Sequence, residues 1–201
     1  MSATNEWQIL YTIGHSNHEA ERFLALLRLH GIEAICDVRS QPYSQYCPQF
    51  NRDALEPALR AAGVRYAFLG RELGARTDDP ACYRDGRVEY ARLAETEQFR
   101  SGVRRVLRAM QTHRVALMCA EKDPLTCHRS ILICRTMRAD TDEIVHILED
   151  GGTETQQEAE RRLMDTLKIV YPDLFHTEAE LIEQAYDRQG ERIAYVQPAA
   201  P

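Results

Sequence analysis

Short apolar runs alternate along the chain with longer stretches in which apolar positions recur every three to four residues. Runs of the first kind are typical of strands buried on both faces, and the second spacing is typical of helices that cover a sheet. The expected strands are residues 9–13, 34–38, 66–69, 114–119 and 144–148. The expected helices are residues 18–30, 53–62, 88–96, 98–111, 124–138, 153–168 and 178–189.

This alternation predicts an α/β fold, a single domain with a mainly parallel β-sheet and helices on both faces. The glycine-bracketed residues 70–74 are expected to form a loop, and the polar, turn-rich residues 75–88 a surface excursion that could act as a lid. The predicted boundaries are 1–196 for the domain, 9–170 for its core, 171–196 for a helical appendage and 197–201 for a disordered tail.

Right-handed crossovers bring every strand-to-helix loop to one edge of a parallel sheet, and open α/β sheets bind ligands at that carboxyl edge. We therefore expect the active-site loops there, after the first four strands. Side chains capable of chemistry concentrate in these loops: His15 and Ser16; Asp37, Arg39, Tyr43 and Ser44; Arg71 and Glu72; Cys119, Glu121, Cys127, His128 and Arg129.

The predicted helix after the fourth strand begins at Asp123-Pro124 and offers free backbone N–H groups at its start. Arg39, Arg71 and Arg129 belong to loops near this helix start, and three guanidinium groups suit a phosphate or a carboxylate there. The competing interpretation pairs the arginines with local acids: Asp37, Glu72 and Glu121.

Cys127 lies near the same helix start, beside His128 and Arg129, where a thiol ionises more easily and becomes a nucleophile. Cys119 ends the preceding strand and faces the same loop. The two cysteines could supply a nucleophile, form a reversible redox pair, or bind a metal ion with His128 or His15. Their spacing matches no standard zinc pattern, so no metal site is assigned and no cofactor is predicted.

Composition narrows the classes of function. The net charge of -6 argues against broad electrostatic binding to nucleic acid, although a local arginine cluster could still contact it. No apolar run approaches the roughly 20 residues that span a bilayer, and residues 1–8 lack the pattern of a signal peptide. A cytoplasmic location with reduced cysteines is therefore expected. The sequence contains neither a dinucleotide fingerprint nor a phosphate-binding loop motif.

Several segments resemble the bacterial and archaeal family catalogued as domain of unknown function 488. The matching segments are Tyr11–Ser16, Asp37–Arg39, Pro42–Ser44 with Phe50–Asn51, Leu69–Gly74, Cys119–Arg129, and His146–Ile147 with Asp150–Gly151. The resemblance implies that the loops described above are the family's signature positions, and it implies no particular reaction. Where the family often has a basic residue after the Pro-x-Ser segment, this chain has Gln45.

Together these features predict an enzyme, a cysteine-dependent hydrolase or transferase that acts on a small anionic or nucleotide-like substrate. Cys119 or Cys127 would supply the thiolate. The expected proton-transfer groups are His15, Asp37, Glu121 and His128. The expected substrate-binding residues are Ser16, Arg39, Tyr43, Ser44, Arg71, Glu72 and Arg129.

Two alternatives stay open. The first is a non-catalytic ligand-binding or nucleic-acid-associated module, in which Tyr43, Tyr46 and Phe50 could stack on bases. The second is a metal-dependent protein with cysteine and histidine ligands. No membrane partner and no particular oligomeric state are predicted.

Overall fold

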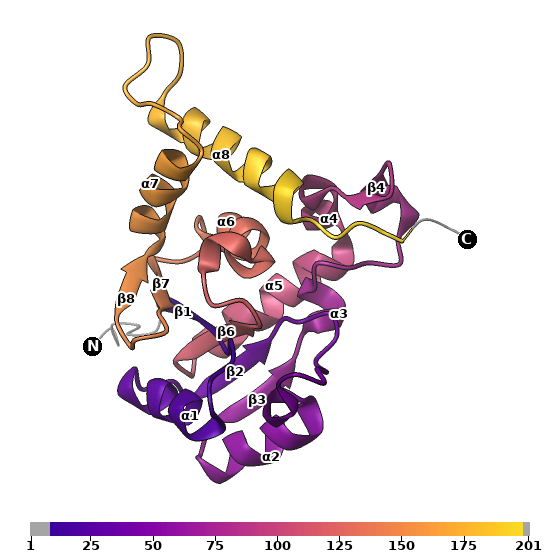
Figure 1. Ribbon diagram of the computed structural model, residues 1–201, viewed down its shortest axis with the longest axis vertical. Coiled ribbons are helices and arrows are strands. Elements are labelled where there is room, and N and C mark those ends of the chain that lie inside the picture. The colour runs from indigo at the N-terminus through magenta and orange to yellow at the C-terminus, as the bar shows by residue number, and fades with distance from the viewer. Residues whose placement is uncertain (1–8, 199–201) are drawn as a thin grey trace.

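The centre of the molecule is a six-stranded sheet with the strand order β3-β2-β6-β1-β7-β8 (Figure 1). The computed structural model describes residues 9–198. Every neighbouring pair is parallel except β7 and β8, so the predicted mainly parallel sheet is confirmed. The strands are β1 (Ile9–Gly14), β2 (Ala34–Asp37), β3 (Arg65–Phe68), β6 (Val115–Cys119), β7 (Glu143–Ile147) and β8 (Thr153–Thr155).

Helices cover both faces of this sheet, as the sequence predicts. One face packs against α1 (Ala20–Leu29) and α2 (Arg52–Ala61), and the other against α5 (Glu97–Met110) and α7 (Gln156–Thr166). The smaller elements are α3 (Gly70–Leu73), α4 (Tyr90–Glu95), α6 (Arg135–Met137), α8 (Glu178–Ile193) and the hairpin of β4 (Tyr83–Arg84) and β5 (Arg87–Val88). Within residues 9–198, no helix combines the length and apolarity that crossing a membrane requires.

Strand β6 shows why the apolar runs are continuous. Its five residues are all buried, and they alternate between the two layers because successive strand residues point to opposite faces. Leu117 and Cys119 join the core under α5, whereas Ala116 and Met118 join the core under α1 and α2. A strand with helices on both sides has no solvent-facing position, so it carries no polar alternation.

The connections after β1 and β6 diverge, and this divergence positions the site. The chain leaves β1 for α1 on one face and leaves β6 for the helical segment of residues 129–137 on the other face. The two strands are parallel neighbours, with Gly14 opposite Cys119 at their carboxyl ends. A crevice forms where adjacent strands send their connections to opposite faces, and ligands of such sheets bind there.

The segment predicted as one helix over residues 124–138 is interrupted, which corrects the sequence prediction. A single 3₁₀ turn, Pro124–Thr126, follows the Asp123 side chain, whose Oδ1 accepts the Leu125 N–H at 2.9 Å. Cys127 is then extended, with φ -131° and ψ 140°. A second helical segment follows, π-helical over Arg129–Cys134 and continued by α6. The Asp-Pro signal specifies only the first turn. The residue after Cys127, His128, is held by the Val38 carbonyl at 3.0 Å, a contact that local sequence signals do not contain.

Three further predictions needed correction. Residues 70–74 contain the one-turn helix α3 instead of a loop, because Leu69 turns the chain directly and Gly70 packs against the Arg39 carbonyl. Residues 75–88 contain a small hairpin with Cys82 and Val88 buried, which anchors the surface excursion to the core. Strand β8 was not expected. Residues 1–8, for which no signal peptide is expected, lie outside the described residues. The last three residues of the predicted tail, 199–201, lie outside them as well.

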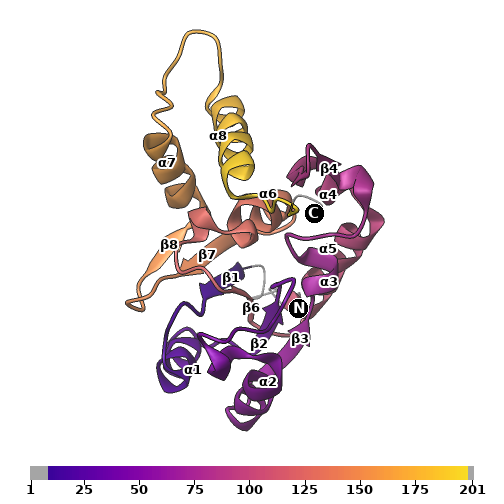
Figure 2. The same ribbon diagram turned by 45° about the vertical axis from the view of Figure 1, so that its right-hand side comes forward.

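The helical hairpin of α7 and α8 projects beyond the sheet (Figure 2) and is anchored by a buried chain of hydrogen bonds. Thr12 Oγ1 in β1 lies 2.8 Å from His146 Nδ1, and His146 Nε2 lies 2.8 Å from Gln156 Oε1. Gln156 in turn donates to the Tyr186 hydroxyl of α8, which donates to Glu160 at 2.7 Å. Because the Gln156 oxygen only accepts, His146 carries its proton on Nε2 and is a neutral acceptor for Thr12.

Buried neutral His146 makes the stability of the protein pH-dependent. Burial, with the nearby Arg129 charge, lowers the pKa of His146 to about 3, from an ordinary value of 6.5. Only the unfolded state then binds a proton between these values, so the associated stability is complete above pH 6.5 and is lost as the pH falls toward 3. Urea denaturation should give a free energy of unfolding about 2 kcal/mol lower at pH 5 than at pH 7 from this group. In His146→Gln the free energy of unfolding should depend less steeply on pH, by the slope that corresponds to about one proton taken up on unfolding. An unchanged slope would contradict the assignment.

Candidate functional site

The loops after β1 and β6 contact each other at the carboxyl edge of the sheet. The His15 N–H donates to the Cys119 carbonyl at 2.9 Å, and the Ser16 N–H donates to the Ala120 carbonyl at 2.8 Å. The approach is so close that a Cβ added to Gly14 would lie 1.9 Å from the Glu121 carbonyl oxygen. Only glycine fits at this position, because any larger residue would push the β6 loop away.

Asp37, Arg39 and His15 form a buried cluster at the ends of β2 and β1. The Arg39 guanidinium grips the Asp37 carboxylate through Nε at 2.9 Å and Nη2 at 2.6 Å, and the Tyr66 hydroxyl donates to the same carboxylate at 2.8 Å. Arg39 Nη1 lies 3.1 Å from His15 Nε2. Arg39 therefore pairs internally, which favours the salt-bridge interpretation over anion binding for this residue.

His15 is a neutral acceptor in this cluster. Its Nδ1 lies 2.8 Å from the Ser16 carbonyl, which can only accept, so Nδ1 carries the proton and Nε2 accepts from Arg39. Burial and the Arg39 charge lower the pKa of His15 to about 4. The ring stacks on Phe50, with centroids 4.3 Å apart, and Phe50 is fully buried. Phe50 is thus a core residue and has no free face for stacking on a base.

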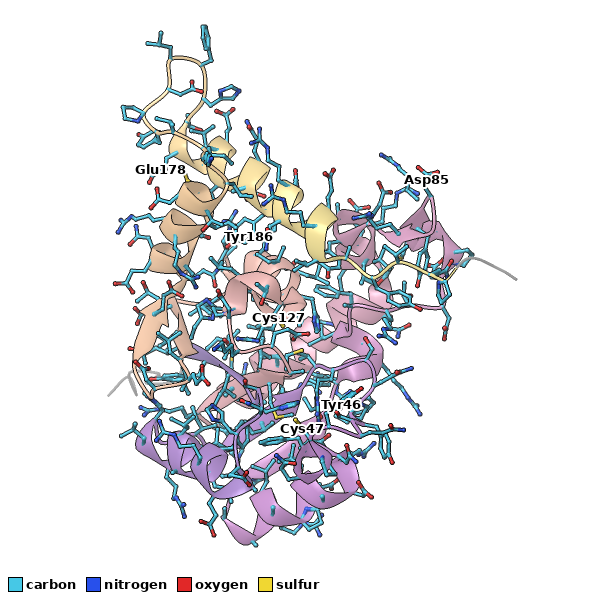
Figure 3. The ribbon with its side chains drawn as sticks, in the orientation of Figure 1. Tyr46, Cys47, Asp85, Cys127, Glu178 and Tyr186 are labelled. Carbon is cyan, nitrogen blue, oxygen red and sulfur yellow. The ribbon has the colours of Figure 1, made fainter. Side chains whose placement is uncertain are left out.

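Cys119, Glu121, Cys127 and His128 form a second cluster beside the first. Cys127 Sγ lies 3.0 Å from Glu121 Oε2 and 3.9 Å from His128 Nδ1, and it accepts the Arg129 N–H at 3.4 Å. Cys119 Sγ lies 3.8 Å from the same His128 Nδ1. Figure 3 shows Cys127 at the centre of the molecule, where the helical segment meets the sheet.

The position of the proton on His128 follows from its hydrogen bonds. His128 Nε2 lies 3.0 Å from the Val38 carbonyl, which only accepts, so the proton is on Nε2 and Nδ1 faces both sulfur atoms. The Val38 carbonyl at the end of β2 therefore fixes both the orientation and the tautomer of the ring. No sequence pattern predicts this contact, because every residue type carries a backbone carbonyl.

The surroundings shift the pKa values of the two thiols in opposite directions. Burial acts to raise the pKa of Cys127, but the hydrogen bond from Cys119 and the Arg129 charge outweigh it and hold the pKa well below the usual value. The hydrogen bond with Cys127, and burial, raise the pKa of Cys119 well above its usual value. Burial would lower the pKa of His128, but its interaction with Cys127 raises it. Burial and Cys127 likewise raise the pKa of Glu121. Of the two thiols, Cys127 therefore ionises more easily than Cys119.

Arg129 lies in the interior, with no exposed surface. Its Nη1 donates to the Glu121 carbonyl at 2.5 Å and its Nη2 donates to the Lys122 carbonyl at 3.0 Å. The guanidinium group therefore holds the β6 loop from the protein interior. Gly14 allows the β1 loop to contact the same β6 loop at the Glu121 carbonyl. These contacts favour a structural role for Arg129 over a place at a pocket rim.

Arg71 lies apart from Arg39 and Arg129, on the exposed surface after β3. It lines a hollow of about 530 Å³ together with Ser40, Arg76 and Gln98. Within the described residues, neither Arg71 nor Arg76 forms an ion pair, and Arg76 stacks on the Tyr195 ring at 4.4 Å. No sequence pattern singles out Arg76, because it stands alone in a polar stretch and only the fold brings it beside Arg71.

The remaining candidates lie on the rim or take part in local contacts. Glu72 forms an ion pair with Arg105 of α5. The Ser44 N–H donates to Asn51 Oδ1 at 2.6 Å, and this bond shapes the loop after β2. Tyr43 and Tyr46 project from that loop and are exposed, and Figure 3 places Tyr46 close to Cys47 on this side of the molecule. These tyrosines are the aromatic side chains available to a ligand in this loop.

Residues 19–135, more than half of the chain, match the family described as domain of unknown function DUF488. The chain belongs to the DUF488 family. The matched region contains the loops after β2, β3 and β6, and with them Cys119, Cys127 and His128. No curated protein and no solved structure that was compared matches the chain.

The second cluster, with its two cysteines and one histidine, contains the kinds of ligand atom that bind a metal ion. The sulfur atoms of Cys119 and Cys127 and a ring nitrogen of His128 all lie within 4.8 Å of one another. A tetrahedral zinc ion with Zn–S bonds of about 2.3 Å keeps its sulfur ligands roughly 3.8 Å apart. The three residues could therefore hold a soft metal ion only after a contraction around it.

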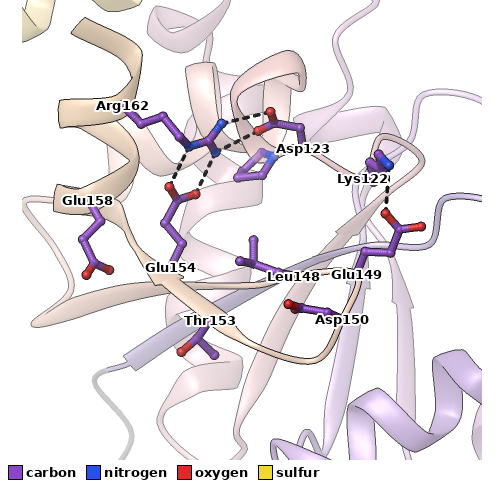
Figure 4. A pocket seen from close by; sticks show the side chains of 10 residues that line it. Lys122, Asp123, Leu148, Glu149, Asp150, Thr153, Glu154, Glu158 and Arg162 are labelled. Atoms are coloured by element: carbon purple, nitrogen blue, oxygen red, sulfur yellow. Dashed lines mark hydrogen bonds and ion pairs between the residues drawn. The ribbon is translucent and has the colours of Figure 1, made fainter. Parts of the chain in front are cut away.

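A second hollow, of about 820 Å³, lies on the β7 side of the DUF488 loop that follows β6 (Figure 4). Arg162 of α7 spans it and is fully paired, with Asp123 at 3.0 Å and Glu154 at 2.7 Å. Lys122 pairs with Glu149 across the mouth at 2.8 Å. Its charged groups satisfy one another, and Asp123 links this hollow to the turn that precedes Cys127.

A pair of arginine substitutions tests the structural role of Arg129. Arg129→Ala should lower the free energy of unfolding by about 3 kcal/mol or more, because it leaves a cavity and two unpaired loop carbonyls in the interior. Arg71→Ala should change it by less than about 0.5 kcal/mol, because its side chain is exposed. Chemical denaturation of both variants and the wild type makes the comparison. Equal, small effects would return Arg129 to the list of ligand-binding candidates.

Proposed function

We propose that this DUF488 protein is a cysteine-dependent hydrolase or transferase that acts on a small anionic or nucleotide-like substrate, with Cys127 as the nucleophile. The observation that carries the proposal is the surroundings of the Cys127 sulfur. A backbone N–H, an imidazole nitrogen and a carboxyl group all face this atom, at 3.4, 3.9 and 3.0 Å. The backbone N–H favours ionisation of the thiol, and the imidazole nitrogen and the carboxyl group can exchange protons with it.

In this proposal the neighbours of Cys127 have separate roles. His128 takes the thiol proton at Nδ1, since its Nε2 is occupied by the Val38 carbonyl. The sulfur attacks the electrophilic centre of the substrate, and His128 or Glu121 returns a proton to the leaving group. Water or an acceptor molecule then releases the covalent intermediate, which distinguishes a hydrolase from a transferase.

The anionic part of the substrate would bind at Arg71 and Arg76. Both guanidinium groups lack ion-pair partners within residues 9–198, and both line the hollow that also contains Ser40. Ser40 is two residues after Val38, whose carbonyl orients His128. A phosphate or carboxylate in this hollow would therefore lie on the same carboxyl edge as the nucleophile, and arginine can bind such groups bidentately.

The alternative with a structural observation behind it is a metal-dependent protein, based on the close approach of Cys119, Cys127 and His128. Elemental analysis of protein purified without chelator separates the two. Stoichiometric zinc or iron that protects Cys127 from alkylation favours the alternative, whereas metal-free protein with reactive Cys127 supports the proposal.

Alkylation kinetics test the nucleophile. Cys36, Cys127 and Cys134 are all buried to a similar degree, so differences in their rates report mainly on ionisation. Burial raises the pKa of Cys36 to about 12 and raises that of Cys134 as well, in contrast to Cys127. With iodoacetamide at pH 7, Cys127 should react at least about tenfold faster than the other two, as peptide mapping would show.

A histidine pair supplies the control. His128→Gln removes the Nδ1 base and should move the pH–rate profile of Cys127 toward that of a free thiol, whose pKa is about 8.5. His113→Gln, at the opposite end of β6, should leave the profile unchanged. Equal reactivity of the three buried cysteines, seen only after denaturation, would remove Cys127 as the nucleophile.

Thermal stability tests the anion subsite. Inorganic phosphate or a nucleoside monophosphate should stabilise the wild type, by about 2.7 kcal/mol at one hundred times the dissociation constant. Arg71→Gln should abolish most of this gain, because it removes an unpaired guanidinium from the hollow. Arg108→Gln, an exposed arginine on α5, is the matched control and should retain the full gain. If neither anion stabilises the wild type, or if both variants respond equally, the subsite assignment fails.

A further inference from the structure

Cys119 and Cys127 form a pair of thiols within one buried cluster. Their sulfur atoms lie within 4.8 Å of each other, although eight positions separate the two residues in sequence. Both side chains are almost fully enclosed, and one imidazole nitrogen faces both sulfurs, at 3.8 and 3.9 Å. The mechanism proposed above uses only one of these thiols, so Cys119 has no role in it beyond donating a hydrogen bond.

The backbone around Cys127 favours the approach that a disulfide requires. A disulfide has an S–S distance of about 2.05 Å, so the sulfurs must move together by roughly 2–3 Å. Cys119 is fixed at the end of β6, but Cys127 is extended and lies between the 3₁₀ turn and the helical segment. A side-chain rotation of Cys127, with a small shift of this linker, can supply that movement without breaking a helix.

We propose that Cys119 and Cys127 form a reversible disulfide when the protein reacts with a hydroperoxide, and that this disulfide switches off the chemistry of Cys127. The disulfide itself is inferred from the juxtaposition of the two thiols and His128. Its effect on turnover rests on the proposed function, in which Cys127 is the nucleophile.

The reaction has two balanced steps. The Cys127 sulfur attacks one peroxide oxygen, the S–O bond forms, the O–O bond breaks, and the alcohol leaves with a proton from His128 or Glu121. The Cys119 sulfur then attacks the resulting sulfenic acid, the S–S bond forms, and the S–O bond breaks. The hydroxide leaves as water with the proton of Cys119, which His128 Nδ1 can transfer because it contacts both sulfurs. Two thiols are oxidised, and one hydroperoxide is reduced to alcohol and water.

Disulfide formation also protects the proposed nucleophile. A sulfenic acid without a neighbouring thiol reacts with more peroxide to form sulfinic acid, which is irreversible in most proteins. A disulfide is returned to two thiols by a dithiol reductant. Cys119 would thus convert a permanent lesion of Cys127 into a reversible state.

Hydrogen peroxide is the appropriate probe, because the two sulfurs are nearly enclosed and it is the smallest hydroperoxide. Treated wild-type protein should lose the mass of two hydrogen atoms, and peptide mapping should find the Cys119–Cys127 cross-link, which dithiothreitol reverses. Cys119→Ser or Cys119→Ala should form no cross-link and should accumulate sulfenic acid at Cys127, trapped by dimedone. Cys134→Ser, a buried cysteine outside the pair, should behave like the wild type.

The outcomes separate this inference from the proposed function. A cross-link that forms and reverses supports the inference even if no substrate adduct of Cys127 is ever found, because the mass measurement needs no activity. If Cys127 in the wild type is oxidised to sulfinic acid as fast as in Cys119→Ser, or if the cross-link joins other cysteines, the inference is overturned. Alkylation of Cys127 by iodoacetamide should stop in the oxidised wild type and continue in oxidised protein that has been reduced again.

Discussion

The site depends on one close approach, the contact between the ends of β1 and β6. Gly14 allows the two loops to meet because a Cβ there would overlap the Glu121 carbonyl, and the Arg129 guanidinium binds that same carbonyl from the interior. The β6 loop is held from two sides at Glu121, so this part of the loop has a fixed position relative to the sheet. A rigid loop of this kind gives a thiol constant neighbours, which is a condition for a shifted pKa.

Charge at the carboxyl edge is divided between two clusters with different chemistry. Arg39 and Asp37 neutralise each other, whereas burial and the Arg39 charge keep His15 neutral as an acceptor. Around Cys127 the hydrogen bond from Cys119 and the Arg129 charge outweigh burial and lower the pKa of the thiol. The separation follows from strand order, because β2 and β1 supply the first cluster and β6 supplies most of the second. Of the three arginines expected to bind an anion, Arg39 and Arg129 pair internally, whereas Arg71 is exposed beside Arg76.

Anchoring by the helices connects this site to the rest of the fold. The helical segment after Cys127 carries His128 and Arg129 and packs in the same core as α5, α7 and α8. The hydrogen-bond chain from Thr12 through His146 to Tyr186 fixes the α7–α8 hairpin to the sheet beneath that segment. Burying the polar side chains of this hydrogen-bond chain costs desolvation free energy. Their hydrogen bonds to one another offset that cost.

The sequence by itself determined the strand and helix alternation, and with it the parallel sheet and the edge that carries the candidate residues. Apolar periodicity and right-handed crossovers are local or general rules, so they need no coordinates. The tertiary structure alone decided which of those residues are enclosed and what each one contacts. It interrupted the predicted helix at Cys127, placed Arg129 in the interior and brought Arg76 beside Arg71. These outcomes depend on contacts between residues far apart in the chain, where a pattern of residue types contains no information on distance.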